Sequence, residues 1–265
     1  MLAAAAACTR QETDSPRMVE WSFDAVATKA GLDQQGRFSW DAGDRIAVWN
    51  ATSGAFVSFR NPAGSARFSA SAPFDAHFTD CAFYPADQVV SAAAVTLPAS
   101  YSGAEEAARA FPMHAVVEEG STLLSFRHLG ALLTVPLVLL PDGAAILEIG
   151  SPSHGLSGTF ALTDTAPRRI EAVAGSGAVR ISIPADALSL TVTLPVPVGS
   201  YPLSIRVLDA AETELFAVEG TEAISFQRAC QYILDIINAS AVHPISVVQT
   251  EMLEIQSDSG AWSHE

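Results

Sequence analysis

The segment Leu188-Ser-Leu-Thr-Val-Thr-Leu194 alternates apolar and polar residues over its whole length. Successive side chains of a β-strand point to opposite faces, so this pattern predicts a strand with one buried and one solvent-facing side. The same alternation recurs at 179–183 and at 203–207. Strands of this half-buried kind are typical of antiparallel sheets.

Short apolar runs separated by turn-forming residues continue this pattern along the chain. Further strands are expected at 19–25, 45–49, 55–59, 79–84, 145–149, 158–162, 214–218 and 232–237. Groups such as Asp41-Ala-Gly-Asp44 and Pro141-Asp-Gly143 supply turns between them. Only 103–110 and 225–231 have a helical pattern. Many brief strands at near-regular intervals predict an all-β protein built as a sandwich or a barrel.

The size and composition of the chain fit two such domains. The chain has 265 residues, of which 49% are apolar and 16% charged, so it can form a sizeable core. A boundary near 118–121 divides it into two tandem antiparallel β-sandwich domains, an N-terminal one at 18–120 and a C-terminal one at 121–240. Residues 1–17 and 241–265 flank them. The net charge of −15 repels phosphate, which excludes nucleic acid as a partner.

The residues that carry catalysis or bind metals form no recognised motif in this sequence. The histidines show no zinc-binding spacing, and neither a phosphate-binding glycine loop nor a nucleophile elbow is present. The string Gly150-Ser-Pro-Ser153-His154-Gly155 is interpreted as a loop. We expect no enzyme activity, no cofactor and no metal. Cys81 and Cys230 lie on apolar segments and are expected to be buried thiols, with a disulfide left open.

The beginning of the sequence suggests a lipid anchor. Residues 1–7 are small and apolar and lead directly into Cys8, which a polar segment follows. This arrangement resembles a bacterial lipobox, in which the cysteine is acylated, although no basic residue precedes Cys8. The alternative is an Ala-rich start with an incidental cysteine. Lipidation at Cys8 would place an exported lipoprotein at the outer membrane.

Several motifs, in this order, resemble the fimbrillin (Mfa-like) family of anaerobic gut and oral bacteria. They are Phe38-Ser-Trp40-Asp-Ala-Gly43-Asp44, Cys81-Ala-Phe-Tyr84-Pro85, Thr96-Leu97-Pro98, Phe111-Pro112-Met113 and Leu123-Leu-Ser-Phe126-Arg-His128-Leu129. The resemblance covers about residues 18–240 and implies two sandwiches of transthyretin-like, Greek-key type.

The resemblance also implies assembly with other fimbrial subunits by exchange of β-strands. Proteolysis would release an N-terminal strand, and a strand of another subunit would fill the groove. The displaceable strand would carry Val19, Trp21, Phe23 and Ala25 on one face. The cleavage loop would lie between Lys29 and Arg37, and the donor strand would contain Ile245, Val247, Leu253 and Ile255.

Other interpretations of the same sequence remain open. Both terminal segments could be permanent strands of one monomer. A monomeric surface lipoprotein could instead bind host glycan or protein through its loops, with Tyr101 or Trp262 stacking on sugars. An envelope accessory protein without a ligand of its own is a third possibility.

Overall fold

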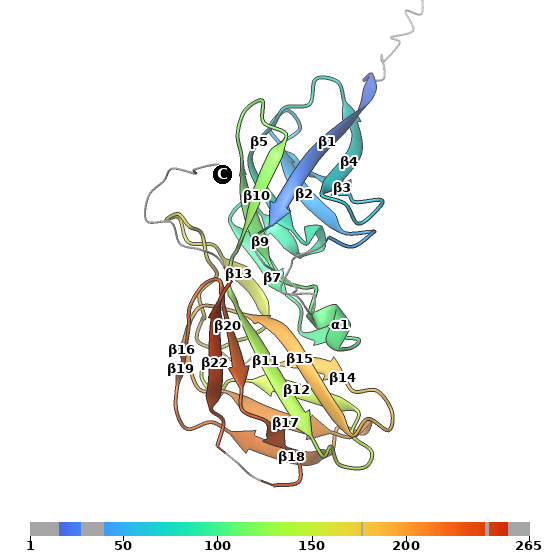
Figure 1. Ribbon diagram of the computed structural model, residues 1–265. Helices are drawn as coiled ribbons and strands as arrows, with labels where there is room; N and C mark the ends of the chain where they lie inside the picture. The colour runs from blue at the N-terminus through green and yellow to red at the C-terminus, as the bar shows by residue number, and fades with distance from the viewer. Residues whose placement is uncertain (1–15, 28–39, 176, 242–243, 254–265) are drawn as a thin grey trace, which may run out of the picture.

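The first seven long strands of the chain close into a barrel. The computed structural model describes residues 16–27, 40–175, 177–241 and 244–253, and Figure 1 shows two stacked units. In the first unit the strands follow the spatial order β1-β10-β9-β5-β2-β3-β4 and then return to β1. Their bounds are β1 (Met18–Ala27), β2 (Arg45–Asn50), β3 (Ala55–Arg60), β4 (Arg67–Pro73), β5 (Phe78–Tyr84), β9 (Met113–Val117) and β10 (Leu123–His128).

This closed sheet corrects the expected N-terminal sandwich. The barrel closes because β1 pairs antiparallel with β4 along one edge and parallel with β10 along the other. A closed sheet leaves no free edge, whereas each layer of a sandwich has two. The interior is filled mainly by aromatic side chains, and Phe59, Phe68 and Phe126 are almost completely buried there.

Two facing sheets form the second unit. One has the order β15-β11-β20-β22, with β21 also beside β11, and the other has the order β18-β17-β12-β14-β8. The bounds of the first sheet are β15 (Ser189–Val196), β11 (Ala131–Val138), β20 (Cys230–Leu234), β22 (Val247–Met252) and β21 (Ile237–Asn238). Those of the second are β18 (Glu214–Glu219), β17 (Ser204–Leu208), β12 (Ile146–Gly150), β14 (Val179–Ser182) and β8 (Ser100–Tyr101).

Alternate residues of both sheets meet in one apolar core. Its members include Leu133, Val135, Ile149, Ile181, Leu194, Ile205 and Leu234, all nearly inaccessible to solvent. Both sheets contain parallel as well as antiparallel pairs, whereas the sequence analysis predicted purely antiparallel sheets. β11 runs parallel to β20 and β21, and β14 runs parallel to β8.

Small elements fill the space between the units and around them. A three-stranded sheet of β6 (Val89–Ser91), β7 (Ala94–Leu97) and β13 (Gly158–Ala161) packs over Cys81 and Phe83 of β5. Strand β16 (Gly199–Tyr201) pairs antiparallel with β19 (Ile224–Phe226) as a separate two-stranded sheet. Two single turns complete the list, the 3-10 helix η1 (Ala86–Gln88) and the α-helix α1 (Ala104–Ala107).

The passage from the barrel to the second unit is short and tightly packed. Strand β10 belongs to the barrel, so the chain leaves the first sheet only after His128, past the expected boundary near 118–121. Gly130 follows, where an added Cβ would lie 2.5 Å from the carbonyl oxygen of Val196. The Leu129 amide donates to the Pro112 carbonyl, and the Ala229 amide donates to the Gly130 carbonyl. These contacts tie the two units together.

The all-β prediction is confirmed, and one predicted helix is wrong. Every strand expected from the sequence overlaps an observed strand. The expected helix at 225–231 is instead the end of β19, a turn and the start of β20. Ala229 in that turn has a φ of 58°, which no right-handed helix permits. No helix in the described part of the chain has the length and apolar character needed to cross a membrane.

Candidate functional site at the first and last strands

Strand β1 lies between two strands that are distant from each other in the sequence. Its register with β4 runs antiparallel from Met18 opposite Pro73 to Asp24 opposite Arg67. Its last residues then run parallel to β10, from Asp24 beside Leu123 onward. Figure 1 shows β1 lying along the barrel wall between these neighbours. Each edge of β1 is therefore paired over part of its length, with β4 along Met18–Asp24 and with β10 along Asp24–Ala27.

The inner face of β1 is the one predicted from the sequence. Phe23 and Ala25 are buried, and Val19 and Trp21 are half-buried. The Phe23 ring meets the Phe59 ring edge-on, with centroids 5.1 Å apart. Trp21 packs against Phe78 at 5.2 Å, and its indole N–H donates to the Pro73 carbonyl over 3.2 Å.

Trp40 holds the C-terminal half of β1 from inside the barrel. Its indole N–H donates to the Ala25 carbonyl over 2.9 Å. The ring is buried against Phe68, Tyr84 and Phe126, with centroid distances of 5.0, 5.1 and 5.9 Å. A buried indole adds both apolar area and a directed hydrogen bond. The tryptophan of the first fimbrillin-like motif is thus an anchor for β1.

Strand β22 is an edge strand with little buried surface. It pairs antiparallel with β20, from Met252 opposite Cys230 to Val247 opposite Leu234. It is the last strand of its sheet among the described residues. Val248 and Met252 are 61% and 59% exposed. The register with β20 shifts between Gln249 and Val247, and Val247 is half-buried against the second core.

Two residues that flank β22 attach it to both units. Ile245 packs against the core of the second unit. Leu253 is only 4% exposed and belongs to the aromatic core of the barrel. The Leu253 amide also donates to the Ala229 carbonyl over 2.7 Å. The last described residue of the chain is therefore part of the barrel core.

Several predicted site residues are not placed by this arrangement. Cys8, Lys29, Arg37, Ile255 and Trp262 lie outside the described residues. Tyr101, expected to be an exposed aromatic, is instead 5% exposed, because its ring packs into the second core. This burial corrects its proposed role as a stacking platform for sugars.

Reactive groups in the described part of the chain form no assembled centre. Cys81 and Cys230 are buried thiols, and burial raises the pKa of the Cys81 thiol to about 11. Such a thiol is a poor nucleophile near neutral pH. The Ser153 hydroxyl lies 2.8 Å from His154 Nδ1, but no carboxylate of a described residue is hydrogen-bonded to this histidine. No group of three or more metal-ligating side chains occurs in the described ranges.

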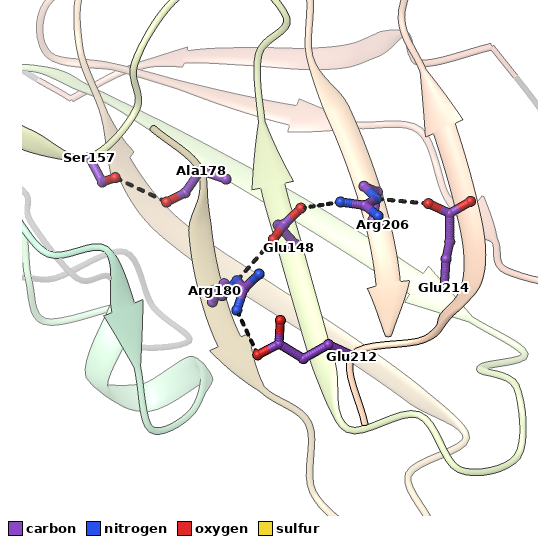
Figure 2. A network of polar contacts seen from close by, with 7 residues as sticks. All are labelled: Glu148, Ser157, Ala178, Arg180, Arg206, Glu212 and Glu214. Carbon is purple, nitrogen blue, oxygen red and sulfur yellow. Dashed lines mark hydrogen bonds and ion pairs between the residues drawn. The ribbon is translucent and has the colours of Figure 1, made fainter. Parts of the chain in front are cut away.

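The sequence analysis missed a charged ladder on the outer face of the second unit. Figure 2 shows Glu148 between two arginines of neighbouring strands. Its carboxylate accepts hydrogen bonds from Arg180 Nε at 2.9 Å and from Arg206 Nη1 at 2.8 Å. Glu212 and Glu214 bind the outer sides of the same two guanidinium groups. The alternation placed these charges outward, but only the strand register could reveal that they meet.

Comparison with known proteins identifies a solved structure of the same fold. No family model matches the sequence, and no curated protein matches it. A crystal structure from Bacteroides ovatus, described as a "putative cell adhesion protein", matches with a TM-score of 0.57 at 13% identity. The match covers 92% of this chain and 100% of that one.

Two further structures are similar at lower scores. One, from Bacteroides uniformis and described in the same words, has a TM-score of 0.49 at 14% identity and covers 92% of this chain and 100% of its own. The other is the tip fimbrial protein Mfa3 from Porphyromonas gingivalis with a C-terminal truncation. Its TM-score is 0.40 at 13% identity, with 89% and 99% covered. Scores at this level support no conclusion. The first match shows that the chain has the fold of the Bacteroides ovatus protein, in agreement with the fimbrillin-like motifs of its sequence.

Proposed function

We propose that this chain is a cell-surface subunit of the adhesive or fimbrial kind, which assembles with other subunits by exchange of β-strands. The observation that carries the proposal is the position of β1, a continuous strand that seals the barrel between β4 and β10. The adhesion role described for the Bacteroides ovatus protein of the same fold supports the cell-surface part of the proposal.

Strand β1 would leave a groove that requires a replacement. Its removal uncovers Phe59 and Phe78, which Phe23 now covers, and frees the paired backbone groups of β4 and β10. Exposing one large apolar side chain costs roughly 1.5–3 kcal/mol, and unpaired backbone groups add to that cost. An incoming strand with apolar side chains at every second position would remove both penalties. The empty groove therefore favours pairing with another subunit.

Strand β22 has the properties expected of a donor strand. Its side chains are mostly exposed, and β20 alone pairs with it in the described chain. All residues from Val248 to Met252 are exposed. After release, the predicted donor residues Ile245, Val247 and Leu253 would enter the groove of a second subunit. Release would cost the Leu253 contacts with the barrel core, the contacts of Ile245 and Val247 with the second core, and the backbone pairing with β20.

The lipid anchor is a separate part of the same proposal. If Cys8 is acylated, each buried CH₂ group contributes about 0.8 kcal/mol to membrane affinity, and two or three chains hold a protein stably. The segment from Cys8 to Met18 would then link the membrane to β1. Cleavage between Lys29 and Arg37 would separate the barrel from this anchor, and β1 would remain with the anchor.

Mild trypsin digestion followed by size-exclusion chromatography tests the assembly route. We expect the uncut protein to elute as a monomer and the protein cut between Lys29 and Arg37 to form larger species as β1 is lost. The matched control is the Lys29→Gln/Arg37→Gln variant, which trypsin cannot cut in this loop and which should stay monomeric. A protein that loses β1 and still elutes as a folded monomer would contradict the proposal.

A further inference from the structure

A cavity lined by both polar and apolar groups lies where the barrel meets the second unit. Its volume is about 640 Å³, within the range of about 300–1,000 Å³ that is usual for small-molecule sites. Its wall comes from the turn that leads into β2, from Ser58 of β3, from the end of β5 together with η1, and from the segment between Pro98 and Ala110. Sites of this kind occur preferentially where two domains meet.

Tyr101 presents an unused hydroxyl to this cavity. The residue is 5% exposed and its ring belongs to the second core, yet it lines the cavity. Its hydroxyl forms no hydrogen bond with any described residue, and it is not among the buried side-chain atoms that lack a partner. The hydroxyl therefore keeps contact with solvent. Burial raises the pKa of Tyr101, and the nearby charges of Glu106 and Asp87 raise it further.

Gln88 provides a second unpartnered group in the same wall. It is 5% exposed, and its Nε2 donates to the Ala110 carbonyl over 2.9 Å. Its Oε1 is the buried side-chain atom that lacks any hydrogen-bond partner in the described chain. Buried amide oxygens are nearly always satisfied by protein, water or ligand. Because this oxygen is inaccessible to solvent, Gln88 forms part of the wall but offers no acceptor to the cavity.

Charged side chains of both signs complete the wall. The Glu106 carboxylate accepts two hydrogen bonds from Ser102 through Oε2, which leaves its Oε1 available. Asp87 and Arg45 line the cavity, and neither forms an ion pair within the described residues. Arg109, by contrast, is paired with Asp41 at 3.2 Å. Donors and acceptors are therefore interspersed around the cavity.

We propose that this cavity binds a neutral saccharide. Each sugar hydroxyl both donates and accepts hydrogen bonds, so a sugar matches a wall that offers Tyr101, Asp87, Glu106 and Arg45 together. The carboxylates disfavour an anionic sugar, and the guanidinium groups disfavour a simple cation. The site does not involve β1 or β22 and is independent of strand exchange. Tyr101 acts here through its hydroxyl and not through its ring face.

Binding of free sugars tests the site directly. The probes are mannose, galactose, N-acetylglucosamine and their neutral disaccharides, measured by saturation-transfer NMR and by calorimetry, with glucuronic and N-acetylneuraminic acids as anionic counterparts. We expect at least one neutral sugar to bind and both anionic sugars to fail. Tyr101→Phe removes only the hydroxyl and should weaken binding at least tenfold. Asp87→Asn provides a second variant should the first fold poorly.

The control is Asp142→Asn, an exposed acid in a turn away from the cavity, which should bind as the wild type does. If no neutral sugar of the panel binds, the proposal is wrong. Equal affinity in Tyr101→Phe, Asp87→Asn and the wild type would place binding elsewhere and overturn it as well. Assembly after trypsin should be unchanged in Tyr101→Phe, so failure of this site and failure of strand exchange are separate results.

Discussion

The indole N–H of Trp40 donates a hydrogen bond to the backbone carbonyl of Ala25 over 2.9 Å, in the interior of the barrel. This bond links the motif that precedes β2 to the strand that seals the sheet. Ala25 is 1% exposed, so its carbonyl has no water to replace a lost donor. The retention of β1 therefore depends on a residue outside the barrel strands.

Replacing Trp40 with Phe should loosen β1 selectively. The variant keeps an aromatic ring but loses the N–H and part of the buried volume, so we expect a loss of about 1–3 kcal/mol in the free energy of unfolding. Amide hydrogen exchange in β1 should accelerate more than exchange in β17. Trp49→Phe is the control, because that ring packs against Phe56 in the outer cluster. Unchanged exchange in β1 would contradict the anchoring role of Trp40.

Replacing Leu253 with Ala should release β22 without unfolding either unit. The side chain is 4% exposed in the barrel core, and Leu→Ala at such sites costs about 2–5 kcal/mol. Because β22 has few other buried contacts, this loss should appear as faster hydrogen exchange in β22. Val248→Ala, at a 61% exposed position, should change stability by less than about 0.5 kcal/mol. Equal exchange rates in the two variants would show that Leu253 does not hold the strand.

Replacing Glu148 with Gln should destabilise the second unit. The Glu148 side chain is 11% exposed and accepts from two arginines, whereas Gln has one acceptor oxygen and presents an N–H₂ group to the other arginine. We expect a loss of about 1–3 kcal/mol in urea unfolding, reduced by the partial exposure of both arginines. The matched variant Glu212→Gln alters an exposed acid and should cost less than about 1 kcal/mol. Similar losses in both would refute a central role for Glu148.

His114 should make the protein less stable in mild acid. Burial, with a smaller contribution from Arg168, lowers the pKa of His114 from 6.5 to about 4. Between these values the unfolded chain binds a proton that the folded chain does not, so stability falls as pH falls from 6.5 towards 4. The loss attributable to His114 between pH 7 and pH 5 is about 2 kcal/mol.

The variant His114→Gln isolates this contribution, because other acidic groups titrate equally in both proteins. Between pH 7 and pH 5 the unfolding free energy of the wild type should fall by about 2 kcal/mol more than that of the variant. Parallel profiles would mean that His114 titrates alike in the folded and unfolded chains.

Period-two alternation predicted the strands well because it reflects the burial of one sheet face. The strands around Ile181, Val192 and Ile205 were placed correctly for this reason, as was the inner face of β1 with Phe23 and Ala25. The pattern does not encode which strands become neighbours. The parallel pairing of β1 with β10, which closes the barrel, joins segments about a hundred residues apart and has no local signal.

The predictions for the segment 225–231 and for Tyr101 differ from the structure for the same reason. The segment around Ala229 has a helical pattern, but pairing of its two ends with β16 and β11 overrides this local preference. The glycan-binding alternative required the ring of Tyr101 at the surface. Its parallel pairing beside Ile181 instead inserts the ring into the second core and leaves the hydroxyl at the cavity. Contacts between distant segments decided both cases.

A disulfide that locks β1 in place tests the proposed assembly most directly. Ser22 of β1 lies opposite Ser69 of β4, and directly opposed residues of antiparallel strands have Cβ atoms about 4.5–5.5 Å apart, close to disulfide range. The measurement is the molar mass by light scattering of Ser22→Cys/Ser69→Cys after trypsin treatment. We predict a monomer when the bond is oxidised and larger assemblies after reduction, with Ser22→Cys alone assembling in both conditions. Equal assembly of the oxidised and reduced double variant would contradict the displacement of β1.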